Sequence, residues 1–399
     1  MRACFIAHSG AEGGAGQALL EAIDALAARG VEARVIVPAR GRLSRECDAR
    51  GIPWTALPYT WWMGEETPLW KRLLKVAING LLTLPLALRL RLWRCDIAYS
   101  NSLTICIGAW SAKLAGLPHI WHVHEFGYEH HRLSFDLGAA FSLRQLARLS
   151  DACIVASRAL AEKFEEHVPR AALHVIYQSV AGPQRRDSPG METTGHGVSA
   201  ANPAEAFRCV IVGALQEGKG QHEAIRAIVD LRQRGVVIDL RIVGSGDASY
   251  ERRLHALAAG HDGSAITFVG FSDDPCAHML AADAVLVCSR YEGFGRVTVE
   301  AMLTGRPVVA ARSGAAPELV RDGFNGLLYE PGDHADLADK VQYLVDHPSA
   351  AHSMGENGKA WAQETFSRER YGAQLLDLLS SVVSNRRGRG AEILPGRMP

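Results

Sequence analysis

Residues 284–301, AVLVCSRYEGFGRVTVEA, join an apolar run, a glycine-containing turn and the start of a helical pattern. The run 284–289 is almost entirely apolar, which is typical of a strand buried on both faces of a sheet. RVTVEAMLTG at 296–305 predicts a helix of about two turns. Gly293 and Gly295 lie between them and allow backbone angles and close approaches that other residues forbid. This order predicts a parallel α/β sheet with a ligand at the turn.

The same pattern of strand and helix recurs along all 399 residues. The first half has six such runs: CFIAHS (4–9), ARVIVPA (33–39), DIAYS (96–100), HIWHVH (119–124), ACIVAS (152–157) and HVIYQS (174–179). The second half also has six: CVIVGA (209–214), LRIVGS (240–245), AITFVGF (265–271), AVLVCS (284–289), PVVAA (307–311) and GLLYE (326–330). We therefore predict two doubly wound, Rossmann-like α/β domains that face each other across a cleft.

Changes in composition suggest where the domains end. The stretch 182–206 is rich in Gly, Pro, Ser and charge, so it reads as an exposed linker between domains at 1–181 and 207–370. An amphipathic helix is expected at 371–385, where it could cross back to the N-terminal domain. The basic segment 386–399 is expected to be disordered.

The bulk composition is that of a soluble globular protein and does not point to a nucleic-acid partner. Lys plus Arg equals Asp plus Glu at 43 each, so no overall field attracts a charged polymer. Eight dispersed cysteines without a Cys-x-x-Cys pair suggest a reducing compartment, and the N-terminus begins a strand without a visible signal peptide. The expected location is the cytoplasm. The apolar run 76–88 is interrupted by Pro85 and is expected to be too short to span a membrane.

The glycine turn has the chemistry of a nucleotide-diphosphate-sugar site. The amides of Val297 and Thr298 in the first helical turn suit a diphosphate. Glu300, about one turn further on, is able to hold both hydroxyls of a ribose. Glu292 precedes the turn and is expected to reach the sugar. The alternative is an ordinary helix start whose acidic residues offset the helix dipole.

The stretch SRYEGFGRVTVEAMLTGRPVVAARSGAAPELVRDGFNGLLYEPGD (289–333) closely resembles the retaining glycosyltransferases of family 4, which have the GT-B fold. The resemblance continues through VGALQEGKGQHEAIRAI (212–228), LRIVGSGD (240–247) and ITFVGFSDDP (266–275). In the first half it is looser, through GGAGQALLEAI (13–23), HVHEF (122–126) and CIVASRALAEKF (153–164).

This resemblance implies roles for further residues. Lys219 matches the cation that neutralises the donor diphosphate. The arginine that usually follows Gly213 is replaced by Ala214. Either Lys219 acts with amides alone, or another cation such as Arg290 or Arg296 compensates. His124 matches a histidine close to the donor sugar. The remaining donor-binding candidates are Gly13, Gly14, Gly213, Gly244, Gly293, Phe294 and Gly295. Gly244 is nearly as well explained as a simple turn, and Gln178 and Ser179 replace the usual Asn-Gly.

The histidines of HIWHVHEFGYEHH (119–131) leave a second possibility open. His122 and His124 share a strand face and could bind a metal together with Glu125. We instead expect no metal and no cofactor, with a UDP- or GDP-linked sugar as the donor, since no Asp-x-Asp signature occurs in the sequence.

The predicted reaction is transfer of a sugar, with retention of anomeric configuration, to a hydroxyl of a glycan or lipid-linked saccharide. The rivals are a GT-B epimerase or hydrolase of nucleotide sugars, a non-catalytic nucleotide-sugar-binding subunit and a metal hydrolase. The segment 54–95 belongs to the acceptor side and mixes five of the eight tryptophans with leucines and cations. It suits an anionic membrane surface on the inner face of the cell membrane, or else forms a helix packed into the core.

Overall fold

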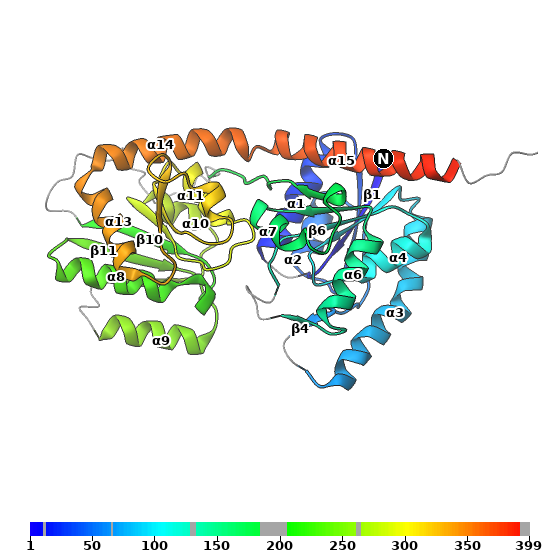
Figure 1. The fold of residues 1–399 in the computed structure, drawn as a ribbon, viewed down its shortest axis with the longest axis horizontal. Coiled ribbons are helices and arrows are strands. Elements are labelled where there is room, and N and C mark those ends of the chain that lie inside the picture. Colours follow the sequence, from blue (N-terminus) through cyan, green and yellow to red (C-terminus); the bar gives the residue numbers. More distant parts are fainter. Residues whose placement is uncertain (11–12, 65–66, 128–132, 184–205, 261–264, 392–399) are drawn as a thin grey trace, which may run out of the picture. The chain divides into compact units, whose positions relative to one another are not determined.

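The computed structural model describes residues 1–10, 13–64, 67–127, 133–183, 206–260 and 265–391. Within it the chain forms two compact units, the first made of Met1–Ser179 with Arg368–Pro399 and the second of Val180–Ser367 (Figure 1). Each unit is built on a parallel sheet covered by helices on both faces. The predicted fold class, two doubly wound α/β domains, is confirmed. Most of the predicted linker 182–206, together with His130 and His131, lies outside the described residues.

The sheet of the first unit has seven parallel strands in the order β3-β2-β1-β5-β6-β8-β9. Their bounds are β1 Arg2–Ala7, β2 Glu32–Val37, β3 Trp54–Ala56, β5 Ile97–Asn101, β6 His119–Val123, β8 Ala152–Val155 and β9 Leu173–Val175. Six of them are the predicted runs. The seventh, β3, is an edge strand of three residues, which is too short to show a pattern in the sequence.

Alternate side chains of these strands enter two separate cores, as the two-residue period of a strand requires. Phe5 packs under α1 Gly14–Ala27, α2 Arg42–Ala49 and the final helix, α15 Arg368–Ala391. Ile6 points to the other face and packs under α3 Leu69–Leu92 and α4 Ile107–Ala115. The unit also contains α6 Ala139–Leu149, α7 Arg158–Phe164, the short helix η1 Arg170–Ala172, and a two-residue antiparallel pair of β4 Met63–Gly64 and β7 Ser134–Phe135.

The last helix, α15, belongs to the first unit although it follows the second in sequence. It buries Tyr371, Leu375 and Leu379 in the core that α1 covers. At Gly372 a Cβ would stand 2.7 Å from the carbonyl oxygen of Ala25, so glycine is what lets the two helices approach closely. The helix spans Arg368–Ala391, longer than the predicted 371–385. Residues 386–391 are therefore helical, contrary to the predicted disordered tail, and 392–399 are not described.

Helix α3 corrects the expectation that Pro85 breaks the apolar run. It is one continuous helix of 24 residues, with Pro85 inside it. By length and composition, α3 is able to cross a membrane, and it is the single such helix among the described residues. The missing amide of a proline removes one hydrogen bond, and the bonds on both sides of it maintain the helix.

The sheet of the second unit has six parallel strands in the order β12-β11-β10-β13-β14-β15, and all six were predicted. They are β10 Phe207–Val212, β11 Ile238–Val243, β12 Ile266–Gly270, β13 Ala284–Val287, β14 Val308–Ala311 and β15 Gly326–Tyr329. Helices α8 Gln221–Gln233, α9 Ala248–Ala259 and α13 His334–Asp346 cover one face. Helices α10 Pro275–Leu280 and α11 Arg296–Leu303 lie on the other, and α12 Ala316–Leu319 and α14 Pro348–Thr365 complete the unit.

All eight cysteines lie within the described residues and none forms a disulfide. Seven are buried, and Cys276 on α10 is partly exposed. They act as small core residues, in agreement with their place in apolar runs.

Candidate functional site

The predicted strand, turn and helix around 284–301 are present in the second unit. Strand β13 ends at Val287, and α11 begins at Arg296 after Gly295, whose φ of 85° lies in the left-handed region. A Cβ at Gly295 would also meet Leu319 Cδ1 and Thr298 Oγ1 at 3.3 Å each. The left-handed backbone angle therefore favours glycine here, and the two side chains leave little room for a Cβ.

The start of α11 carries the donors expected for an anion. The first turn of any helix presents amides without helical acceptors. Here the Thr298 amide already donates to the Gly295 carbonyl at 3.0 Å, so the prediction is better met by Val297 than by Thr298. The Thr298 hydroxyl is buried and has no hydrogen-bond partner among the described residues. Because an unsatisfied buried hydroxyl is costly, this group favours a ligand or water at the turn.

Lys219 and Glu292 meet in an ion pair although 73 residues separate them. Lys219 ends the short helix η2 Glu217–Lys219 after β10, and Glu292 lies in the glycine turn after β13. Their side chains are only 20% and 16% exposed. The strands β10 and β13 are neighbours in a parallel sheet, so both loops leave the same edge. The structure thus brings together the two residues predicted to act on the phosphate and on the sugar.

The backbone holds both partners of this pair in place. Arg290 N donates to the Gly218 carbonyl at 3.0 Å and joins the two loops. The left-handed Gly220 fits against Cys288, because a Cβ there would stand 2.2 Å from the Cys288 carbonyl oxygen. On the other side, Ala315 N donates to the Glu292 carbonyl at 3.0 Å. The pair therefore sits on loops that are fixed by main-chain contacts.

The two cations proposed to replace the missing arginine already have acidic partners. Arg290 contacts Glu223 at 3.3 Å, and Arg296 contacts Glu300 at 3.8 Å on the same helix. Glu223 is buried and also accepts hydrogen bonds from the Tyr329 hydroxyl and the Gly332 amide, so Arg290 belongs to a structural network. Compensation for the missing arginine by Arg290 or Arg296 stays a prediction.

Gly213 and Gly244 end the neighbouring strands β10 and β11 and touch each other. A Cβ at Gly244 would stand 1.9 Å from the Gly213 carbonyl oxygen, and Gly244 has a φ of 144°. The close packing of the two strand ends is thus enough to explain glycine at 244, which agrees with the alternative of a simple structural turn. A role of either residue in donor binding stays a prediction.

Phe294 has a structural role that the sequence did not indicate. Its side chain is 4% exposed and packs edge-on against Phe366, with ring centroids 5.6 Å apart. The ring therefore anchors the glycine turn to the end of α14. Only the main chain of Phe294 remains to contact a donor.

In the first unit, His124 follows β6 and is held between two amide side chains. Its Nε2 lies 2.7 Å from Asn101 Oδ1, and its Nδ1 lies 2.8 Å from Gln178 Nε2. Gln178 donates to Nδ1, so the proton is on Nε2 and is donated to Asn101. His124 is able to bind a sugar hydroxyl through a ring nitrogen only if one amide moves away. This arrangement was not predicted from the sequence. The feature of the sequence that could have indicated it is Gln178, which stands in place of the usual Asn.

Gly13 and Gly14, at the start of α1, are exposed, as expected for a ligand-facing turn. Gly13 is the N-cap residue, and a Cβ there would meet nothing within 4 Å. The adjacent Ala15 carbonyl accepts a hydrogen bond from Asn101 Nδ2 at 2.9 Å. The Asn101 side chain therefore links the start of α1 to His124 within the first unit. Gly13 and Gly14 stay candidates.

The other residues of the predicted metal reading have protein partners. His122 is buried and bonds through Nδ1 to the Tyr99 hydroxyl. The Glu125 carboxylate accepts from Ser102 Oγ at 2.5 Å and from the Leu103 amide at 2.8 Å. Across the described residues, no three His, Cys, Asp or Glu side chains converge as metal ligands would. His122 and Glu125 therefore read as parts of the core.

Two buried histidines make the first unit sensitive to acid. Burial lowers the pKa of His119 and of His122 to about 3. The unfolded chain, with a histidine pKa of about 6.5, binds these protons first, so stability is lost as pH falls from about 6.5 toward 3. We expect the free energy of unfolding to drop by about 2 kcal/mol per histidine between about pH 7 and pH 5.

Urea unfolding followed by tryptophan fluorescence tests this, because all tryptophans except Trp361 belong to the first unit. Replacing His119 and His122 by Gln should flatten the pH dependence, and the same change at the exposed His352 should not. An unchanged slope in the double variant would show that other groups cause the acid sensitivity.

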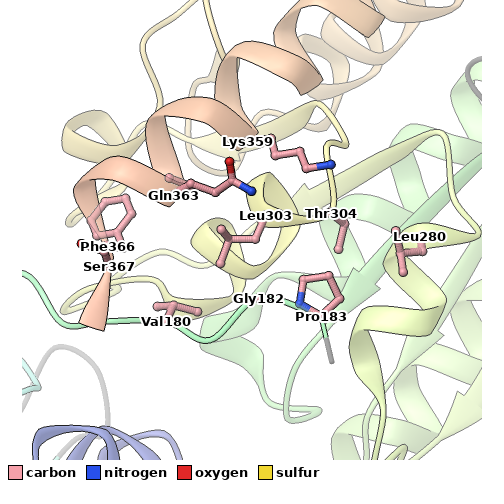
Figure 2. Close-up of a pocket in the computed structure, with 11 residues that line it drawn as sticks. Val180, Gly182, Pro183, Leu280, Leu303, Thr304, Lys359, Gln363, Phe366 and Ser367 are labelled. Atoms are coloured by element: carbon pink, nitrogen blue, oxygen red, sulfur yellow. The ribbon is translucent and has the colours of Figure 1, made fainter. Parts of the chain in front are cut away.

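A hollow of about 420 Å³ lies at the other end of α11, against the end of α14 (Figure 2). It is lined by Leu303, Thr304, Lys359, Gln363 and Phe366, among others. Phe366 lines the hollow and also packs against Phe294 of the glycine turn, with ring centroids 5.6 Å apart. None of the predicted site residues lines it.

Comparisons with known proteins agree with the resemblance seen in the sequence. The family model of the glycosyl transferases group 1 matches residues 199–361, and that of the glycosyl transferase 4-like domain matches residues 13–178. The uncharacterized glycosyltransferase MJ1178 of Methanocaldococcus jannaschii is 28% identical over 267 residues, which are 66% of this chain and 69% of that protein.

Two further proteins are similar to this chain. The lipopolysaccharide core biosynthesis glycosyltransferase LpsE of Rhizobium meliloti is 33% identical over 181 residues, 45% of this chain and only 51% of that protein. The crystal structure of Anabaena Alr3699/HepE in complex with UDP-glucose has a TM-score of 0.75 and 26% identity, and covers 96% of this chain and 100% of that one. Family models thus match both halves, and the whole chain has the architecture of a glycosyltransferase. The protein belongs to the group 1 glycosyltransferases and has their GT-B fold.

Proposed function

We propose that this glycosyltransferase moves a sugar from a UDP- or GDP-linked donor to a hydroxyl of a glycan or lipid-linked saccharide, with retention of anomeric configuration. The ion pair of Lys219 and Glu292 beside the glycine turn carries the proposal. It places a cation and a carboxylate together at the carboxyl edge of a doubly wound sheet, where such folds bind nucleotides. The acceptor is proposed only from the chemistry of the reaction, which requires a nucleophilic hydroxyl.

The donor is assigned to the second unit from three groups. The first turn of α11 receives the diphosphate, Lys219 neutralises its charge, and Glu300 holds the ribose hydroxyls. The Glu300 side chain is 20% exposed and lies on α11, five residues after Gly295. The similar Anabaena protein binds UDP-glucose, and a mannosyltransferase of Mycolicibacterium smegmatis that is 33% identical over 179 residues is named as GDP-mannose-dependent, so the proposal keeps both bases.

The proposed reaction breaks the bond between the anomeric carbon and the diphosphate oxygen on the same face from which the acceptor attacks. The leaving phosphate takes the proton of the acceptor hydroxyl, so no protein nucleophile is needed. Lys219 stabilises the charge that develops on the diphosphate, and Glu292 positions the sugar. The protein contributes charge stabilisation and orientation, using its own side chains and amides.

A thermal-shift panel of nucleotide diphosphates and their sugars tests the donor assignment. A true donor at a hundred times its dissociation constant should stabilise the protein by about 2.7 kcal/mol, and nucleotides with the wrong base should not. Stabilisation by none of the UDP and GDP compounds would contradict the proposal. Release of free sugar without an acceptor would instead identify a nucleotide-sugar hydrolase.

A further inference from the structure

Helix α3 lies on the outside of the first unit (Figure 1), and its sequence forms a long apolar stripe. Its members recur every three or four residues and so share one side of the helix: Trp70, Leu74, Ala77, Leu81, Leu84, Leu88 and Leu92. The tryptophan and leucines of the stripe are each between 51% and 77% exposed, and Leu73 beside them is also exposed. A soluble monomer rarely leaves so many large apolar side chains in contact with water on one helix.

Cations border this stripe. At about 100° per residue, Lys71 and Arg89 fall on one side of it and Arg91 on the other. The sequence from Leu69 to Arg94 contains no Asp or Glu. The ring of Trp70 lies 5.4 Å from Lys71 Nζ, and that of Trp93 lies 5.4 Å from the Arg89 guanidinium carbon. Apolar side chains edged by cations and aromatic rings are typical of a helix that lies in a membrane interface.

The opposite side of α3 is fastened to the first unit along its length. Leu86, Ala87 and Leu90 are buried in the core under α3 and α4. The Asn79 amide exchanges hydrogen bonds with the main chain of Thr60 at 2.9 and 3.0 Å, and Lys75 pairs with Asp136 at 2.8 Å. A helix that crossed the bilayer would have to leave these contacts and expose charged and polar groups to lipid. The packing therefore favours an orientation parallel to the membrane plane.

We propose that the stripe of α3 docks the first unit on an anionic lipid bilayer, with its leucines among the upper acyl chains and its cations at the headgroups. A second copy of the chain is a poorer occupant, because a symmetric pairing through α3 would bring Lys71, Arg89 and Arg91 near the same set of cations on the other copy. The proposal concerns the first unit alone and does not depend on the identity of the donor.

Flotation of the full-length protein with lipid vesicles tests the proposal. The wild type should float with vesicles of phosphatidylcholine and phosphatidylglycerol, float less with phosphatidylcholine alone, and lose binding as salt is added. Leu81→Ser with Leu88→Ser should weaken binding at least about tenfold, since two exposed anchors are removed. Lys71→Gln with Arg89→Gln should weaken it by roughly five-fold per cation.

Matched controls come from exposed residues of the second unit. Val237→Ser with Phe271→Ser removes side chains that are 55% and 62% exposed, and Arg226→Gln with Arg252→Gln removes two exposed cations. Both control pairs should bind vesicles as the wild type does. Wild-type protein that stays with the lipid after alkaline carbonate would overturn the interfacial orientation and indicate a spanning helix.

Other outcomes would remove the membrane altogether. Equal flotation of the α3 variants and the wild type would reject this surface. An α3 variant that changes the protein from dimer to monomer, with no vesicle binding by the wild type, would assign the stripe to a second copy. Thermal shifts with nucleotide diphosphates should be the same in all these variants, so failure of this inference is distinguishable from failure of the proposed function.

Discussion

Replacing Lys219 by methionine is expected to lower kcat for sugar transfer by about 10²–10³. Methionine keeps much of the length of the side chain but removes the charge that opposes the growing negative charge of the leaving diphosphate. The effect should be large because the Lys219 side chain is only 20% exposed, so water screens its charge poorly. Initial rates at saturating donor and acceptor give kcat directly.

Two controls separate the charge from the fold. Lys219→Arg keeps the cation and should retain more activity than the methionine variant. Lys340→Met on α13 breaks another lysine–carboxylate pair, with Asp336 at 3.6 Å, far along the chain from the glycine turn, and should leave kcat unchanged. A methionine variant at position 219 that transfers sugar at the wild-type rate would remove Lys219 from the mechanism.

Replacing Glu292 by glutamine is expected to lower kcat by about a hundredfold while the affinity for the nucleotide diphosphate changes by less than about threefold. The reason is that Glu292 is assigned to the sugar, which the free nucleotide lacks. The glutamine should keep its place, because the main chain of residue 292 is bonded to Ala315 and packed against Gly314. Transfer assays and calorimetric titration with the nucleotide measure the two quantities.

Glu300→Gln provides the opposite pattern for comparison. This substitution should lower the affinity for the nucleotide by about tenfold or more, because it replaces the charged carboxylate that accepts hydrogen bonds from the ribose by a neutral amide. Equal losses of transfer and nucleotide affinity in Glu292→Gln would count against a role on the sugar. The double variant Lys219→Met with Glu292→Gln should be less impaired than the two single effects combined, because the two side chains contact each other.

The strands and the glycine turn could be predicted because their signals are local. Each buried parallel strand is a short apolar run, so all six strands of the second unit were found in the sequence. Gly295 has a left-handed φ that few other residues adopt, so the turn before α11 was also visible. The elements that were missed, β3 and the β4–β7 pair, have two or three residues each and carry no period.

Helix α3 was misjudged for a physical reason. Pro85 predicts a break when the helix is considered alone, but packing of Leu86, Ala87 and Leu90 against the first unit stabilises both halves of the helix around it. The sequence left open whether this segment is a core helix or a membrane surface. The structure shows that one side of α3 is buried in the core of the first unit and that the other side is exposed.

The sequence by itself determined the fold class, the family and the position of the glycine turn, because apolar runs, glycines and neighbouring motif residues act over short distances along the chain. The tertiary structure alone decided which side chains meet. It paired Lys219 with Glu292 across 73 residues, gave Arg290 to Glu223, buried Phe294 against Phe366 and held His124 between Asn101 and Gln178. The order of strands in a sheet brings distant loops to one edge, and no local pattern in a single sequence specifies that order.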